Sequence, residues 1–216
     1  MFTTLTAADG HRLGCWIAPA QGPKIGGLVI LQEIFGVTDQ LKRVAARYAA
    51  LGLEVAVPAL FDRQRRDTVF PFDAATEGRA LAMAADLDDV MRDVAAAMAA
   101  VGSPAAVLGF CWGGGLAIRA AQDLDVACAV CFYGTRLPQY LDRPLRAPVL
   151  GHFGREDDHV PPDMLAAARE ALPEMEVHMY DGGHAFANDA RASYRAEAAE
   201  AAHARSEAFL RAHLGG

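Results

Sequence analysis

A cysteine lies inside a glycine-rich segment, residues 109–114, with the sequence GFCWGG, directly after an apolar run and directly before a helical pattern. Small residues two positions before and after a nucleophile permit a sharp turn from strand to helix, which lifts the side chain above the sheet edge. The positive end of the following helix favours a thiolate, the reactive form of cysteine. The pattern predicts that Cys111 is a nucleophile, although a buried structural thiol is the usual fate of free cysteine.

A cysteine nucleophile needs a base that exchanges protons near neutral pH, and histidine oriented by a third group provides one. His184 lies in a glycine-rich loop, DGGHAF, just past the last expected strand. Open parallel sheets collect their site residues at the carboxyl ends of strands, so we expect His184 to be the base rather than a surface loop histidine.

The acid is expected between nucleophile and base in chain order, which points to residues 153–161, FGREDDHVP. Asp157 is the preferred acid and Asp158 is the alternative. His159 is expected to be a local loop residue, because it belongs to the same turn as the acid and cannot easily be oriented by it.

A second loop, QEIFG at residues 32–36, leaves the first buried strand. Its backbone N–H at Ile34, together with that of Trp112, is a candidate oxyanion hole. Glu33 in this loop is by default a solvated group or a helix cap, and beside a catalytic thiol it has a second use as a proton partner.

The elements that must position these residues follow an alternation of short apolar segments and longer Ala-rich patterns. This alternation is typical of a mainly parallel sheet with helices on both faces, in a single α/β domain over residues 1–216. We expect an edge strand at 13–18 and further strands at 27–31, 53–57, 105–108, 126–132, 148–153 and 175–180. Helices are expected at 40–51, 77–101, 113–122, 161–172 and, with a solvated charged face, 191–214, and a loop or cap at 61–76.

Composition limits the possible partners. The chain is 53% hydrophobic and 22% charged, which is enough apolar material for a sizeable core. Its net charge of -7 argues against binding to nucleic acid or anionic lipid. The N-terminus lacks the features of a secretory signal, and no apolar run approaches the roughly 18 residues of a membrane helix. We therefore expect a protein of the cytoplasm. We also expect a monomer, which no feature of the sequence requires.

The four cysteines, at positions 15, 111, 128 and 131, are too few for a disulfide scaffold and fit reduced thiols. Cys128 and Cys131 form a C-x-x-C within an apolar run expected to be a strand. Positions three apart on a strand point to opposite faces, so we expect no metal or redox role for this pair.

Four motifs in this order make the chain resemble the dienelactone hydrolase family, small α/β-hydrolase-fold enzymes with a Cys, His, Asp triad. They are QEIFG at 32–36, GFCWGG at 109–114, D-x-x-VP at 157–161 and GH-x-F at 183–186, and the resemblance covers nearly the whole chain. It implies that Cys111 attacks a lactone carbonyl and that Asp157, favoured over Asp158, completes the triad with His184. It also implies that Glu33 holds the resting thiol and takes its proton as substrate binds, with no metal or organic cofactor.

The resemblance breaks down at substrate recognition. Family members are expected to hold a substrate carboxylate with arginines, one of them four residues after the catalytic histidine, where this chain has Asn188; Ala185 likewise replaces a hydroxyl residue. A bidentate Arg–carboxylate contact is strong and oriented, so a neutral Asn weakens recognition of an acidic lactone. The predicted substrate-contacting residues are Phe35, Phe186, Asn188 and Arg79.

Another carboxylate-binding arginine would come from the cluster Arg63, Arg65, Arg66 and Arg79, although surface arginines are usually only solvated. Dienelactone and other small esters, lactones or thioesters all remain candidate substrates. The sequence thus predicts a cysteine-dependent hydrolase that opens a small lactone or carboxylic ester through a thioester. The alternatives are a hydrolase-fold binding or sensor module without turnover, and a peptidase or acyltransferase on the same scaffold.

Overall fold

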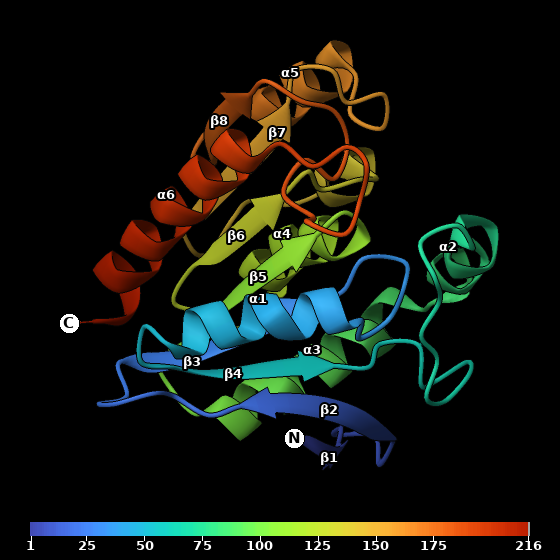
Figure 1. Cartoon of the computed structure of the whole chain (residues 1–216), viewed down its shortest axis with the longest axis vertical. Coiled ribbons are helices and arrows are strands. Elements are labelled where there is room, and N and C mark those ends of the chain that lie inside the picture. The colour runs from blue at the N-terminus through green and yellow to red at the C-terminus, as the bar shows by residue number, and fades with distance from the viewer. Residues whose placement is uncertain (216) are drawn as a thin grey trace. The chain divides into compact units, whose positions relative to one another are not determined.

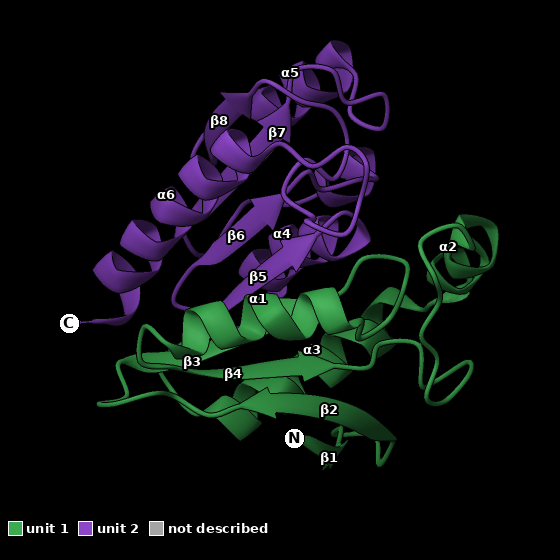
Figure 2. Ribbon diagram, in the orientation of Figure 1, with its two compact units in different colours: residues 1–106 green, residues 107–216 purple. Residues whose placement is uncertain are grey.

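The computed structural model describes residues 1–215, and the chain divides into two compact units at residues 106 and 107 (Figure 2). Unit 1 comprises residues 1–106, and unit 2 begins at residue 107. Each unit has strands flanked by helices. The expectation of one domain over residues 1–216 stays a prediction.

Unit 1 contains β1 (Phe2–Thr6), β2 (Arg12–Ala18), β3 (Gly26–Leu31) and β4 (Leu53–Pro58), in the spatial order β1-β2-β4-β3. The pairs β1/β2 and β2/β4 are antiparallel, and β3/β4 is parallel with Leu28 opposite Val55. Helices α1 (Asp39–Ala49) and α3 (Leu87–Val101) cover opposite faces, while α2 (Ala75–Ala84) lies beyond the carboxyl end of β4 (Figure 1). Every residue of β3 is buried, as its continuous apolar run predicted.

One prediction for the unit 1 strands is wrong, and one strand was missed. The edge strand is β1, which was not predicted, and β2 lies between β1 and β4 rather than at the edge. The sequence of β1, FTTLT, has four of its five residues exposed. A strand without a buried face lacks the apolar alternation by which strands are identified, and this is why β1 was missed.

The prediction of a single helix over 77–101 is also wrong, because α2 and α3 are separate helices. Ala85 and Asp86 have extended backbone angles, and the Asp86 side chain accepts a hydrogen bond from the Asp89 N–H at 3.0 Å. Asp86 is therefore the N-cap of α3. The Ala-rich pattern continues across this break, so periodicity alone could not reveal it.

Unit 2 contains four parallel strands in chain order: β5 (Ala105–Phe110, starting at the unit boundary), β6 (Ala129–Phe132), β7 (Val149–Gly154) and β8 (Glu176–Tyr180). Helix α6 (Ala196–Leu214) covers one face, and α4 (Trp112–Asp123) and α5 (Pro162–Ala171) cover the other (Figure 1). These strands and helices agree with prediction to within a few residues. The exception is α6, which begins at residue 196 rather than 191.

Most charged side chains of α6 are exposed, as expected of a solvated face. Among the helices of residues 1–215, none is long and apolar enough to cross a membrane.

Candidate active site

Cys111 occupies the turn between β5 and α4 with φ 55° and ψ -115°, a backbone conformation that L-residues rarely adopt. Its carbonyl oxygen holds the turn by accepting hydrogen bonds from the N–H groups of Gly114 and Thr135, each at 3.0 Å. A Cβ atom on Gly109 would lie 1.8 Å from the Gly113 oxygen, so only glycine fits there. This geometry is the sharp strand-to-helix turn that the G-x-C-x-G spacing predicted, and the role of Cys111 as nucleophile stays a prediction.

His184 and Asp157 contact each other directly. The Nδ1 atom of His184 lies 2.9 Å from Oδ2 and 3.1 Å from Oδ1 of Asp157. The Asp157 side chain is fully buried, whereas Asp158 is exposed to solvent. Asp157 rather than Asp158 is thus the carboxylate that orients the ring.

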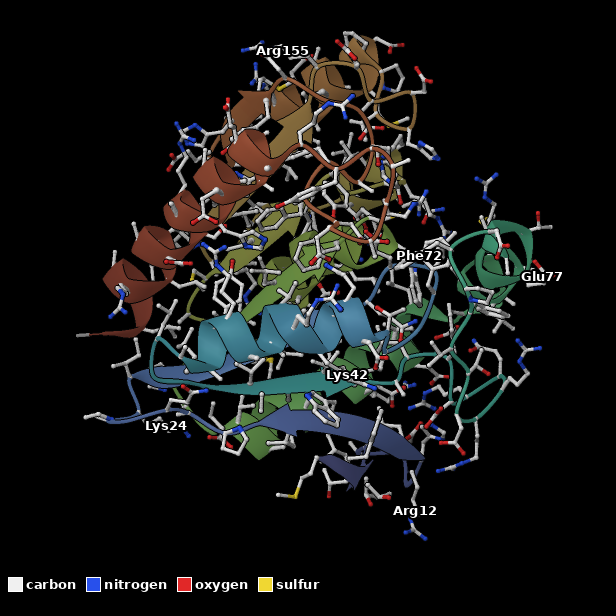
Figure 3. The ribbon with its side chains drawn as sticks, viewed as in Figure 1. Arg12, Lys24, Lys42, Phe72, Glu77 and Arg155 are labelled. Carbon is white, nitrogen blue, oxygen red and sulfur yellow. The ribbon has the colours of Figure 1, made fainter. Side chains whose placement is uncertain are left out.

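The loops that carry the acid and the base are joined through their backbones. The N–H of Arg155 donates to the Tyr180 oxygen at 2.9 Å, and the N–H of Glu156 donates to the Gly182 oxygen at 3.0 Å. A Cβ on Gly154 would lie 2.3 Å from the Gly182 oxygen, so the close approach of the loops requires glycine. The Arg155 side chain points outward, away from this junction (Figure 3).

The electrostatics of His184 favour its protonated form. Burial of the ring lowers its pKa, but hydrogen bonds to Asp157 and Cys111 outweigh burial and raise the pKa to about 10. A cationic imidazole beside a sulfur stabilises the thiolate electrostatically, and the N-terminus of α4 acts in the same direction. His184 therefore interacts with both Asp157 and Cys111, and the catalytic roles of the three residues stay predictions.

Two further rings contact His184. The ring of His159 stacks on it at a centroid distance of 4.1 Å, and Tyr133 presents an edge at 5.3 Å. The N–H of His159 also donates to Asp157 Oδ1 at 2.8 Å. Sequence reasoning identified His159 only as a loop residue and missed Tyr133. The signal for Tyr133 was its place directly after β6, at the carboxyl end of a parallel strand.

The predicted substrate-contacting residues of unit 2 are buried in the loop that carries His184. Phe186 stacks on Tyr180 at 5.1 Å and meets Tyr133 edge-on at 5.5 Å. Asn188 is 1% exposed, and its Oδ1 accepts a hydrogen bond from the Ala190 N–H at 3.0 Å. Both side chains support the loop from within, and their contact with substrate stays a prediction.

The QEIFG loop of unit 1 is held by neighbours within that unit. The Gln32 side chain accepts a hydrogen bond from the Leu60 N–H at 3.1 Å. Glu33 is 6% exposed, and Thr38, not Glu33, caps α1. The two default roles of Glu33, a solvated group and a helix cap, are therefore both excluded.

The rest of this loop packs closely on the segment that follows β4. The Phe70 N–H donates to the Phe35 oxygen at 2.9 Å, and Gly36 has φ 81°. A Cβ on Gly78 of α2 would lie 1.8 Å from the Ile34 oxygen. Phe35 packs edge-on against Phe72 at 4.9 Å and is 2% exposed. The backbone around Ile34 is thus fixed by close contacts.

Three arginines of the expected cluster have structural partners. Arg63 binds Asp93 through two hydrogen bonds of 2.8 Å and Asp9 through one of 2.7 Å. Arg65 donates to the Thr68 hydroxyl, and Arg66 donates to the Arg12 oxygen. Arg79 is exposed on α2 and, among the described residues, has no hydrogen bond or ion pair. It is the arginine of the cluster most available to a ligand.

The predicted site residues therefore fall in both units. Cys111, Trp112, Asp157 and His184 belong to unit 2, where the three triad residues are brought together. The predicted residues Phe186 and Asn188 also belong to unit 2, whereas Glu33, Ile34, Phe35 and Arg79 belong to unit 1.

Comparison with known proteins identifies the family of the chain. A model of the dienelactone hydrolase family matches residues 13–214. The chain belongs to the dienelactone hydrolase family. A carboxymethylenebutenolidase from a Pseudomonas species is 32% identical over 225 residues, covering 96% of this chain and 93% of the relative. The carboxymethylenebutenolidase of Pseudomonas putida is 30% identical and covers 96% of this chain and 94% of its own.

Solved structures give the same family and fold. A dienelactone hydrolase candidate from Klebsiella pneumoniae has a TM-score of 0.83 at 25% identity and covers 97% of this chain and 98% of its own. The α/β-hydrolase fold predicted from the sequence is confirmed. Membership of the dienelactone hydrolase family makes the protein a hydrolase that acts on small-molecule esters or lactones, which favours the enzyme over the binding-module alternative.

Proposed function

We propose that this dienelactone hydrolase-family protein opens a small lactone or carboxylic ester through a thioester on Cys111. The observation that carries the proposal is the position of His184, hydrogen-bonded to both Asp157 and Cys111, with Cys111 at a nucleophile elbow. This is the arrangement that nucleophilic catalysis by cysteine requires.

In the first half of the reaction, the Cys111 sulfur adds to the substrate carbonyl carbon and forms a carbon–sulfur bond. Negative charge develops on the carbonyl oxygen, near the N-terminus of α4, where the Trp112 N–H is the proposed donor. The tetrahedral intermediate then collapses and breaks the carbon–oxygen bond of the ester. In a lactone the leaving oxygen stays attached to the acyl chain, and it takes the proton held by His184.

In the second half, water attacks the thioester carbon, and His184 accepts one proton from that water. Asp157 keeps the ring oriented with Nδ1 toward the carboxylate and stabilises the imidazolium that forms. Collapse of the second intermediate breaks the carbon–sulfur bond and releases the acid. The reaction as written needs no redox step.

Two further roles rest on the family resemblance. Glu33 is proposed to hold the resting thiol and to take its proton as substrate binds, and the Ile34 N–H is proposed as the second oxyanion donor. Burial of Glu33 within its own unit is compatible with a functional carboxylate. Replacing Glu33 with Gln keeps its size and removes its charge, and we expect kcat to fall while the free energy of unfolding changes little.

We propose that the enzyme prefers neutral esters or lactones to substrates that carry a carboxylate. Asn188 stands where a carboxylate-binding arginine is expected, and Arg63 is already bound to Asp93 and Asp9. Arg79 is the arginine we propose for any carboxylate contact. A neutral aryl ester should therefore be hydrolysed at least as efficiently as dienelactone.

The test is hydrolysis of dienelactone beside a neutral aryl ester by wild type, Cys111→Ala and Arg79→Gln, with intact-protein mass spectrometry of quenched reactions. We expect turnover that depends on Cys111 and an acyl mass increment on wild type that is absent from the Ala variant. The Arg79→Gln variant should lose activity toward dienelactone selectively.

Other outcomes would separate the alternatives. Cys111-independent turnover would contradict the nucleophile. A stable acyl adduct without product release would favour the sensor module, and transfer of the acyl group to an added alcohol or amine would favour an acyltransferase. We also propose a monomer in the cytoplasm, the former to be tested by sedimentation equilibrium.

A further inference from the structure

Three potential metal ligands lie together in unit 2: Asp157, His159 and His184. One ligand atom from each can be chosen so that all three lie within 4.8 Å of one another. Nδ1 of His184 is 2.9 Å from Asp157 Oδ2, and Nδ1 of His159 is 3.7 Å from Asp157 Oδ1. Within the described residues, this is the group of His, Cys, Asp or Glu side chains that meets such a criterion.

The distances fit a tetrahedral ion. Zinc binds imidazole nitrogen and carboxylate oxygen at about 2.0–2.2 Å, so two ligand atoms of a tetrahedral site are about 3.3 Å apart. Measured from one oxygen, Asp157 Oδ1, Nδ1 of His184 lies 3.1 Å away and Nδ1 of His159 lies 3.7 Å away, and these separations bracket this value. The ring of His159 must turn out of its stack on His184 to direct Nδ1 at the ion. The three side chains differ in exposure, because Asp157 is buried, His184 is 15% exposed and His159 is 47% exposed. Solvent can thus reach the ligand set from the His159 side.

The donor set also fits the chemistry of zinc. Two imidazoles and one carboxylate are the ligands of several catalytic zinc sites, which leave a fourth position for water. Two backbone hydrogen bonds hold the loops of Asp157 and His184 together, so both ligands are positioned before an ion arrives.

We propose that Asp157, His159 and His184 form an inhibitory site for Zn²⁺, in which the ion takes the place of the proton shared by His184 and Asp157. Binding forms bonds from zinc to Nδ1 of each histidine and to an Asp157 oxygen, and the proton leaves to solvent. No electron is transferred. Zinc on this site is an inhibitor and takes no part in turnover.

The reason for inhibition is the tautomer that zinc imposes. With Nδ1 of His184 engaged by Asp157, Nε2 remains for the hydrogen bond to Cys111. A neutral imidazole bound to zinc through Nδ1 carries its proton on Nε2 and has no lone pair to accept another. His184 then cannot accept the proton of the attacking water, and turnover stops. This inhibitory consequence rests on the proposed function, whereas binding does not.

The competing arrangement is zinc held by Cys111 and His184 Nε2, and the experiment is designed to separate the two. Isothermal titration calorimetry with ZnCl2 measures binding to wild type, His159→Gln and Cys111→Ser. The matched control is His178→Gln, because His178 is also a part-exposed histidine beside a carboxylate, 2.6 Å from Glu176. Inhibition constants for ester hydrolysis are measured on all variants that turn over, each relative to its own metal-free rate.

We expect His159→Gln to weaken zinc binding and inhibition together by at least about tenfold. The His178→Gln control should change neither, and Cys111→Ser should retain calorimetric binding. With Co²⁺ as a spectroscopic probe, the wild-type complex should show no sulfur-to-cobalt charge-transfer band. Thermal unfolding of each variant checks that the fold is kept.

The proposal is overturned if His159→Gln binds zinc as tightly as wild type, if Cys111→Ser abolishes binding, or if a charge-transfer band appears. Zinc binding without inhibition would remove the inhibitory role. If wild type hydrolyses no ester at all, the proposed function fails, and calorimetry on the same variants still decides whether the metal site exists.

Discussion

Two buried cysteines of unit 2 have opposite surroundings. Cys131 lies within β6, directly opposite Gly109 of β5, and Cys111 lies two residues beyond Gly109. Cys131 is enclosed by the core, and burial raises the pKa of its thiol to about 12. Cys111 instead has a helix N-terminus on one side and a hydrogen bond to His184 on the other. Burial alone makes a thiol inert, and reactivity requires groups that stabilise the thiolate.

The other two cysteines resemble Cys131. Burial raises the pKa of both the Cys15 and the Cys128 thiol to about 12. All four residues have the same thiol group, so Cys111 differs from the other three only in its position, directly after the carboxyl end of β5. The following predictions test this contrast, beginning with the largest effect.

The largest expected difference is in turnover. Cys111→Ala should reduce kcat/KM for a neutral ester by about a thousandfold or more, because the attacking atom is lost. Cys131→Ala removes a more deeply buried sulfur two residues away in register and should keep kcat/KM within a few fold. Steady-state hydrolysis rates at matched folded concentration measure both. Equal losses in the two variants would mean that packing, and not nucleophilicity, explains the effect.

The second difference is in alkylation. A thiol with a pKa of about 12 is thiolate in only about one molecule in 10⁵ at pH 7, and the other buried cysteines share this property. Native protein should therefore take up one equivalent of iodoacetamide, at Cys111, at least about a hundredfold faster than at any other cysteine. Peptide mass spectrometry locates the label. Cys111→Ala protein should remain unlabelled over the same period, and early labelling of Cys128 would contradict the contrast.

The third difference is in the pH dependence of stability. The pKa of His184, about 10, lies above its unfolded value of about 6.5, so the folded protein holds a proton that the unfolded chain lacks between these pH values. This contribution is complete below about pH 6.5 and is lost as the pH rises through 10. Wild type should lose stability over this interval more steeply than His184→Gln, by at most about 1.4 kcal/mol per pH unit.

Urea denaturation at a series of pH values measures this slope. Cys131→Ala should keep the wild-type slope, whereas Cys111→Ala should flatten it, because Cys111 is one of the groups that raise the pKa of His184. Parallel curves for wild type and His184→Gln would show that the ring is not held protonated.

The smallest difference is in packing. Cys131→Ser places a hydroxyl in a fully buried site and should lower the free energy of unfolding by about 1–3 kcal/mol. Cys111→Ser should lower the free energy of unfolding by less, because His184 is available as a hydrogen-bond partner for the new hydroxyl. Chemical denaturation of both variants at pH 7 gives the comparison, and the reverse ranking would refute it.

The turn at Cys111 and the contact between His184 and Asp157 could be predicted from sequence because each part is encoded in a few adjacent residues. The turn at Cys111 depends on Gly109, where an added Cβ would lie 1.8 Å from the Gly113 oxygen. The acid and base loops likewise follow β7 and β8 directly. Short-range rules of turns and strand ends were sufficient for these features.

Other features depend on partners far away in the chain. The role of Arg63 is decided by Asp9 and Asp93, which lie 54 and 30 residues from it. The stacking of His159 on His184 joins two loops that local rules treat separately. The break between α2 and α3 did have a local signal, the Asp86 cap, but an uninterrupted Ala-rich pattern outweighed it.

The backbone junction between the acid and base loops has a consequence for how this enzyme can change. Its hydrogen bonds run from the N–H groups of Arg155 and Glu156 to main-chain oxygens, so they do not depend on which side chains those residues carry. The exposed side chains of Arg155 and Asp181 project from the same junction into solvent. Mutation there alters surface charge beside the catalytic loops while the separation of Asp157 and His184 is maintained. Substitution of Arg155 or Asp181 should therefore change the surface charge at this junction and leave the separation of Asp157 and His184 unchanged.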